Sequence, residues 1–145
     1  MLKKAIITLI LSLPLSVWAQ PTSDVDAQQA LIHDLNALAN ASCLIKQKDA
    51  YLQNAGYIWA NSLAEGNMEF NLETVLLPMK AAIEKAIANT PMYSVPSEQP
   101  PLKSQALPIA YCFDVIYQPN VQALIRELSK KYLSLIHISE PTRRY

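Results

Sequence analysis

Apolar residues recur at helical spacing over most of this chain, and this periodicity constrains the fold more than any other sequence feature. Leu31, Leu35, Leu38 and Ile45 form the first apolar stripe, and Ser23 can cap its N-terminus. Polar residues occupy the opposite face: His33, Asn36, Asn40 and Gln47. Because strand signals are few, we predict an all-α fold, a small bundle of about four to five helices with one disulfide.

Three further helices are expected. One runs from about Asp49 to Glu65, and Gly56 in its middle indicates a close helix crossing. Another begins near Asn71, and Pro78 either kinks it or starts a fresh helix. Residues 109–117 fit a buried helix or a strand, and Pro119 can open the last helix. The apolar side of the helix near Asn71 is expected to comprise Leu72, Val75, Leu76, Met79, Ile83 and Ile87.

The first nineteen residues are typical of a secretory signal peptide. Lys3 and Lys4 precede a short apolar stretch over residues 5–13, and Ala19 is the small residue that a signal peptidase accepts. Gln20 follows in place of the cysteine that a lipid anchor would require. We therefore expect residues 1–19 to be removed and the protein to be periplasmic, with no membrane segment after cleavage.

The C-terminal segment is not expected to belong to the natural protein. Residues 133–143 resemble the translation of a sequencing adapter, although their alternating apolar residues would also fit a strand over residues 133–138. We therefore expect one helical domain over residues 20–132 and a non-native tail over residues 133–145. That domain has 8 basic and 11 acidic residues, a net charge of −3, which disfavours nucleic acid and anionic lipid and suits a basic protein partner.

The domain contains two cysteines, Cys43 and Cys112. In an oxidising compartment an even pair indicates one disulfide, which would join the first helix to the segment before the last one. The alternative is two buried free thiols. A redox-active pair is disfavoured because the two residues lack CxxC spacing.

Residues 90–108 contain five prolines and no glycine, which is typical of an extended, semi-rigid loop. Such a loop either contacts a partner or serves as a plain linker. Tyr93 and Glu98 lie in it and are the candidate partner-contact residues, since loop aromatics are good anchors. Most of the other aromatics, Tyr51, Tyr57 and Trp59 among them, are expected to be buried or half-buried.

Catalytic and cofactor-binding patterns are missing from the sequence. His33 is the only histidine before the tail, and it is expected to be solvated. Together with the paired cysteines, this disfavours a Cys-His dyad, a Ser-His-Asp triad and a histidine- or cysteine-rich zinc site. Gly56 and Gly66 are the only glycines, so no phosphate-binding loop can form. We predict no enzymatic activity, no cofactor and no metal, and interpret Glu65, Glu69 and Glu73 as a solvated acidic edge.

Residues 112–117, CFDVIY, followed by the closing helix over residues 121–128, resemble the periplasmic immunity proteins that neutralise type VI secretion amidase effectors. Ser42-Cys43-Leu44 fits the early cysteine position of that family, and Asp114 and Tyr117 fit the later segment as structural positions. The resemblance implies an all-helical fold, a Cys43–Cys112 disulfide, a homodimer, and inhibition by plugging the substrate cleft of a peptidoglycan amidase. The proline-rich segment is longer than the family pattern implies.

The leading hypothesis is therefore a periplasmic immunity protein that binds and inhibits a peptidoglycan amidase effector. The alternative is a non-enzymatic structural or adaptor protein that binds another envelope component. A neighbouring gene for a secreted Cys-His amidase would favour the first, and its absence the second.

Overall fold

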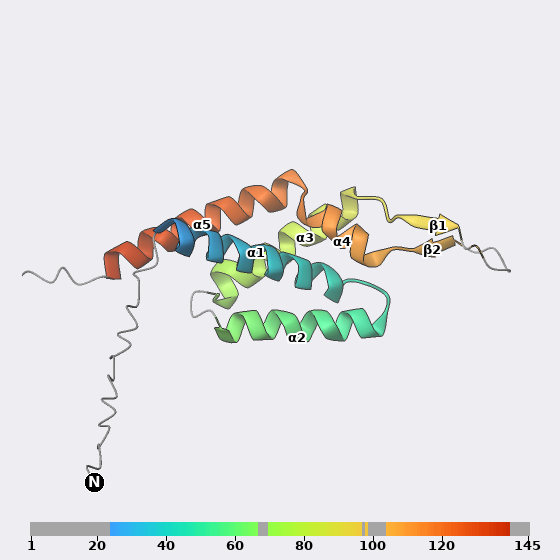
Figure 1. Cartoon of the computed structure of the whole chain (residues 1–145), viewed down its shortest axis with the longest axis horizontal. Coiled ribbons are helices and arrows are strands. Elements are labelled where there is room, and N and C mark those ends of the chain that lie inside the picture. The colour runs from blue at the N-terminus through green and yellow to red at the C-terminus, as the bar shows by residue number, and fades with distance from the viewer. Residues whose placement is uncertain (1–23, 67–69, 97, 99–103, 140–145) are drawn as a thin grey trace, which may run out of the picture.

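The computed structural model describes residues 24–66, 70–96, 98 and 104–139 (Figure 1). The predicted helical bundle with one disulfide is confirmed, and two short strands are added to it. The elements in chain order are α1 (Asp24–Ile45), α2 (Ala50–Gly66), the π-helical turn η1 (Leu72–Leu76), α3 (Leu77–Asn89), β1 (Ser94–Pro96), β2 (Ser104–Ala106), α4 (Pro108–Ile116) and α5 (Pro119–Ser139). The expected signal peptide lies outside the described residues.

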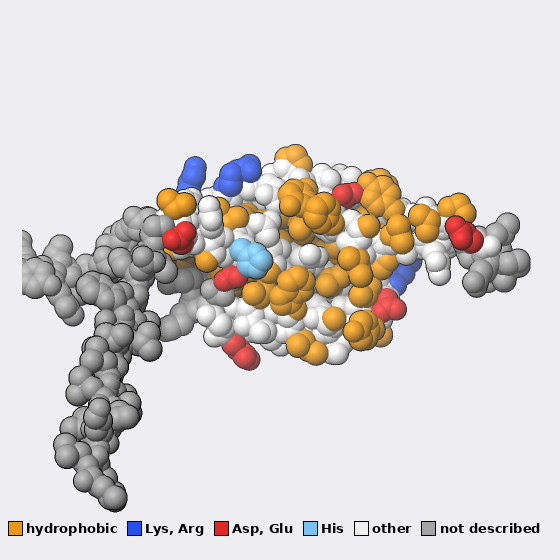
Figure 2. All heavy atoms as spheres, viewed as in Figure 1, with side chains coloured by type: hydrophobic (Ala, Val, Ile, Leu, Met, Phe, Trp, Pro, Cys, Tyr) orange, Lys and Arg blue, Asp and Glu red, His pale blue; other side chains and the backbone are white. Residues whose placement is uncertain are grey.

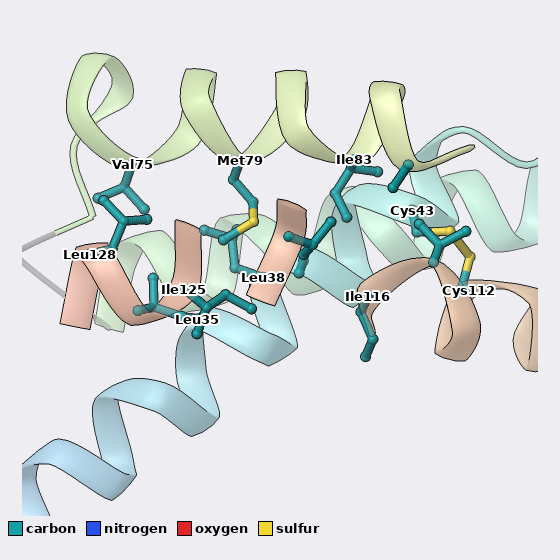
Figure 3. Close-up of a cluster of buried hydrophobic side chains, with 14 of the residues drawn as sticks. Leu35, Leu38, Cys43, Val75, Met79, Ile83, Cys112, Ile116, Ile125 and Leu128 are labelled. Carbon is teal, nitrogen blue, oxygen red and sulfur yellow. A yellow bond between two sulfur atoms is a disulfide. The ribbon is translucent and has the colours of Figure 1, made fainter. Parts of the chain in front are cut away.

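Helix α1 is the centre of the bundle and packs against α2, α3, α4 and α5. Its predicted apolar stripe is confirmed, because Leu31, Leu35 and Leu38 are buried. Figure 3 shows Leu35 and Leu38 in one cluster with side chains from η1, α3 and α5, and the disulfide lies at one end of that cluster. The fully buried residues around this stripe include Val75, Met79, Ile83, Val115, Val121 and Ile125.

The expectations for Leu72 and Gln47, one placed toward the core and one away from it, are wrong. Leu72, placed on the apolar side of the third helix, is 61% exposed. It belongs to η1, whose π-helical turn is wider than an α-turn and rotates Leu72 out of the stripe that begins at Val75. Gln47, placed on a polar face of α1, is only 5% exposed, because α1 ends at Ile45 and the chain then turns inward.

The crossing of α2 over α1 depends on Gly56, as its position predicted. Gly56 is buried, and a Cβ atom there would lie 2.8 Å from the Ala41 carbonyl oxygen and 2.8 Å from the Ile45 amide nitrogen. Figure 1 shows α2 on the outside of the bundle, alongside α1. Only a residue without a side chain allows the two backbones to come this close.

Pro78 begins a helix after a short irregular turn, which settles the choice left open by the sequence. It lies in the first turn of α3, directly after η1. The Asn71 side chain caps η1 by accepting a hydrogen bond from the Thr74 amide. The Tyr132 hydroxyl from α5 is hydrogen-bonded to the Thr74 hydroxyl, so this bond connects η1 to the C-terminal part of α5.

The proline-rich segment, expected to be an extended loop, forms a β-hairpin. β1 and β2 are antiparallel, with Val95 opposite Gln105, and the Leu107 amide donates to the Tyr93 carbonyl just below the strands. Figure 1 shows this hairpin projecting from one end of the helical body. Prolines are compatible with it because a two-stranded hairpin leaves one edge of each strand unpaired.

The segment over residues 109–117, left open between helix and strand, is helical. Pro108 lies in the first turn of α4, where its missing N–H costs no hydrogen bond. Pro119 opens α5, which continues beyond Tyr132 to Ser139. Residues 133–138 are therefore helical and not the strand that their alternating pattern would also fit.

Candidate functional site

The hairpin is the most exposed ordered feature of the described structure. All six residues of β1 and β2 are exposed, and so is Glu98 beyond β1. Tyr93 is also exposed, but it lies at the root of the hairpin, one residue before β1. The structure thus places the two candidate contact residues differently: Glu98 toward the hairpin end and Tyr93 against the helical body.

A largely apolar hollow of about 630 Å³ lies at this root. We call it the root pocket and define it by its lining residues, Tyr93, Leu107, Pro108, Ile109, Ala110, Phe113 and Asp114. The first two come from the base of the hairpin, and the others belong to α4. Figure 2 shows hydrophobic side chains gathered on the surface near the hairpin root. A concave, mostly apolar site with one polar group is typical of a binding pocket.

A side-chain hydrogen bond joins the hairpin side of the root pocket to its α4 side. Tyr93 donates its hydroxyl to the Asp114 carboxylate, and this bond together with the negative charge raises the pKa of Tyr93. Tyr93 therefore stays protonated to higher pH than a free tyrosine. The bond fixes the base of the hairpin against the outer side of α4.

The outer face of α4 is apolar and uncovered. Ile109, Phe113 and Tyr117 follow one another at four-residue spacing and are all more than half exposed, with Ile109 at 69%. The rings of Phe113 and Tyr117 lie 4.8 Å apart, centroid to centroid, in a tilted arrangement. The stripe runs on from the root pocket, so apolar surface extends along the full length of α4.

The inner face of α4 is held firmly. The predicted Cys43–Cys112 disulfide is present and joins α4 to the end of α1, with both cysteines fully buried. The Gln47 side chain donates to the Cys43 carbonyl at 3.0 Å and approaches the Cys112 sulfur at 3.3 Å. The Tyr111 hydroxyl donates to the Ile87 carbonyl at 3.0 Å, and burial raises the pKa of Tyr111. Sequence reasoning missed Gln47 because it lies beyond the helix whose periodicity it appeared to follow.

A second uncovered apolar face lies on α2. Tyr51, Tyr57 and Trp59 are all exposed, Tyr51 at 79%, so the expectation that these aromatics are buried or half-buried is wrong; Ile58 beside them is exposed too. The reason is that α2 lies at the edge of the bundle and packs chiefly on α1. Of the seventeen residues of α2, only Glu65 is charged. Helical spacing places four residues of α2 on one face: Tyr51, Ala55, Ile58 and Ser62. The spacing alone does not show whether another helix covers that face.

The remaining candidate groups do not come together. His33, Glu65 and Glu73 are exposed on α1, α2 and η1, and Glu69 lies outside the described residues. Among the described residues no group of three or more histidine, cysteine, aspartate or glutamate side chains could hold a metal ion. The described helices also include none that is both long and apolar enough to cross a bilayer.

The fold and the site define a small disulfide-linked helical domain with a projecting hairpin and an apolar pocket at its root. No protein-family model, curated protein or solved structure matches the chain.

Proposed function

We propose that this protein is a periplasmic, non-enzymatic immunity protein that binds and inhibits a type VI secretion peptidoglycan amidase. The observation that carries the proposal is the projecting hairpin, whose strands are wholly exposed and whose root is fixed to a rigid body. A narrow two-stranded projection has the shape needed to enter an enzyme's substrate cleft. The secretory leader expected at residues 1–19 would bring it to the compartment where such an amidase acts.

The hairpin is well suited to binding without a large loss of conformational freedom. Pro91 and Pro108 restrict the backbone on both sides of it, Pro96 restricts the backbone within β1, and the Tyr93–Asp114 bond holds its base. Ordering of loops is one of the main costs of association, so a loop already held in shape binds more tightly. The catalytic groups of the partner would be blocked by occupancy alone, which requires no reactive residue on this chain.

The test is inhibition of a secreted Cys-His amidase encoded next to this gene. Equimolar protein should abolish cleavage of peptidoglycan peptides, and Val95→Arg in β1 should raise the inhibitor concentration needed at least tenfold. Val25→Arg is the matched control, because Val25 is also exposed but lies at the start of α1. Full amidase activity in the presence of equimolar protein would refute the proposal. Binding to purified envelope material without inhibition would favour the adaptor alternative instead.

We also propose that a second copy of this chain covers the outer face of α2. A face with almost no charge can meet its own copy without repulsion, and depletion of charge is typical of interface cores. Sedimentation analysis should show a homodimer that Ile58→Arg converts to a monomer, while Leu72→Arg, an equally exposed site on η1, leaves it intact. A monomeric wild-type protein at high concentration would refute this part.

A further inference from the structure

The root pocket is an apolar hollow with one carboxylate, and a hairpin that only blocks a substrate cleft would not need such a hollow at its base. A hairpin acting only as a plug could sit on any stable surface, yet here its base borders a hollow of about 630 Å³. That volume exceeds one side chain by several fold, so the hollow can take a bulky aliphatic group and its neighbour. Its floor is α4, which the disulfide and the Tyr111 hydrogen bond hold in place.

The pocket combines apolar walls with a single negative charge. Among the described residues that line it, Asp114 is the only ionisable acid or base besides the Tyr93 phenol, and it is partly buried. Phe113 presents an exposed aromatic ring next to it, followed by Tyr117. A carboxylate beside aromatic faces attracts a lysine or arginine through both the ion pair and the cation–π interaction.

We infer that the root pocket is an anchor site for a partner segment that presents an aliphatic side chain directly beside a lysine or arginine. The aliphatic group fills the hollow between Leu107, Ile109 and Phe113, and the cation reaches Asp114. The identity of the partner as an amidase rests on the proposed function, whereas the chemistry of the anchor does not. The hairpin and the anchor would then engage one partner at two adjoining places.

Charge decides between a basic partner and a second copy at this face. Residues 91–118 contain Glu98, Lys103 and Asp114 as their only charged side chains, and residues 20–132 have a net charge of −3. Two copies meeting at the root pocket would bring one Asp114 carboxylate near the other, which disfavours self-association there. A basic segment is attracted by the same charge.

The first experiment measures affinity for the amidase of the proposed function. Phe113→Ala should weaken binding at least tenfold, since it removes the exposed ring that forms the pocket wall. Asp114→Asn should weaken binding severalfold, mainly by slowing association, and should reduce its dependence on salt. Asparagine keeps an oxygen that can accept from Tyr93, so this variant removes the charge and keeps the hydrogen bond.

Two matched controls separate the pocket from general effects of substitution. Leu72→Ala truncates an apolar side chain that is similarly exposed on η1, and Asp34→Asn neutralises a partly buried carboxylate on α1. Both should leave affinity within twofold of the wild type. Equal losses in the pocket variants and the controls would overturn the inference, as would wild-type affinity in Phe113→Ala.

The second experiment needs no amidase. NMR titration of the protein with acetyl-Lys-Leu-Lys-amide should shift the amide signals of Ala110, Phe113 and Asp114, with saturation in the millimolar range. Acetyl-Glu-Leu-Glu-amide and acetyl-Lys-Ser-Lys-amide should shift them much less, because each lacks one of the two features. Equal shifts with all three peptides, or shifts that persist in Phe113→Ala, would overturn the inference.

The outcomes distinguish failure of the inference from failure of the proposed function. Inhibition of the amidase that is unaffected by Phe113→Ala and Asp114→Asn would leave the immunity function standing and remove the anchor site. Selective binding of the basic aliphatic peptide, with no effect on any amidase, would support the anchor site and assign it to another basic partner.

Discussion

Replacing Gly56 by alanine tests how closely α2 is seated on α1. The added Cβ would lie 2.8 Å from the Ala41 carbonyl oxygen, 2.8 Å from the Ile45 amide nitrogen and 2.9 Å from the Ile45 Cγ1 atom. Unstrained contacts of this kind are roughly 3.5 Å or longer. Because two of the three atoms belong to the α1 backbone, no side-chain rotation can relieve the overlap, and α2 must move away from α1.

Two opposing terms set the size of the effect. Overpacking a tight contact costs about 1–3 kcal/mol, and contact with backbone places Gly56→Ala near the upper end of that range. Alanine in place of glycine inside a helix returns about 1 kcal/mol. We therefore expect Gly56→Ala to lower the free energy of unfolding by about 2 kcal/mol.

Gly66→Ala is the matched control, since it makes the same chemical change at the end of the same helix. A Cβ at Gly66 would have no neighbour within 4 Å, so this variant keeps the propensity gain and should be neutral or slightly stabilising. Urea denaturation followed by circular dichroism measures both, and the Gly56→Ala midpoint should fall by roughly 1 M relative to Gly66→Ala. Equal midpoints for the two variants would refute the close-crossing argument.

Three further predictions concern the disulfide, a buried hydroxyl and a titration. Replacing Cys43 and Cys112 together by alanine should lower the free energy of unfolding by about 4 kcal/mol, because the disulfide joins residues 69 positions apart and restricts the unfolded chain. Urea denaturation measures this loss of stability, and a loss below about 1 kcal/mol would contradict the loop-entropy argument. Tyr132→Phe removes the hydrogen bond to η1 and should cost about 1 kcal/mol by the same assay, with unchanged stability as the contrary result. Since the folded-state pKa of Tyr93 is raised, its contribution to stability is complete below the pKa of an unfolded tyrosine and is lost as the pH rises through the folded value. NMR titration of Tyr93 should show ionisation at a higher pH than in a free tyrosine. Asp114→Asn removes the charge and keeps a hydrogen-bond acceptor, so it should lower the pKa of Tyr93 in part; an unchanged pKa in that variant would contradict the contribution of the charge.

The helices could be predicted because their apolar residues repeat with a period that only a helix places on one face. Leu31, Leu35 and Leu38 specify one side of α1 whatever packs there. The even cysteine pair likewise indicates the bridge, and Gly56 indicates a close helix crossing. These are local signals that tertiary contacts reinforce.

The hairpin and the burial of Gln47 could not be predicted, because both depend on the residues at which the helices and strands begin and end. The strand sequences SVP and SQA contain no alternating apolar pattern, and no two-residue turn signal joins them. The pairing is continued at the base by a hydrogen bond from the Leu107 amide to the Tyr93 carbonyl, a contact between residues fourteen positions apart that no local pattern signals. Gln47 followed the period of α1 by count, yet α1 ends two residues earlier and the side chain turns onto the disulfide.

The two faces of α4 explain why the candidate site is both exposed and rigid. A helix of nine residues is too short to persist alone in water, so α4 exists because its inner side is fixed by Cys112 and Tyr111. That attachment leaves its outer side free to present Ile109 and Phe113 without collapsing onto the core. Exposed aromatic side chains on a pre-ordered support lose little conformational entropy when a partner covers them. The disulfide therefore serves the site as well as the fold, because it turns a short apolar segment into a fixed surface.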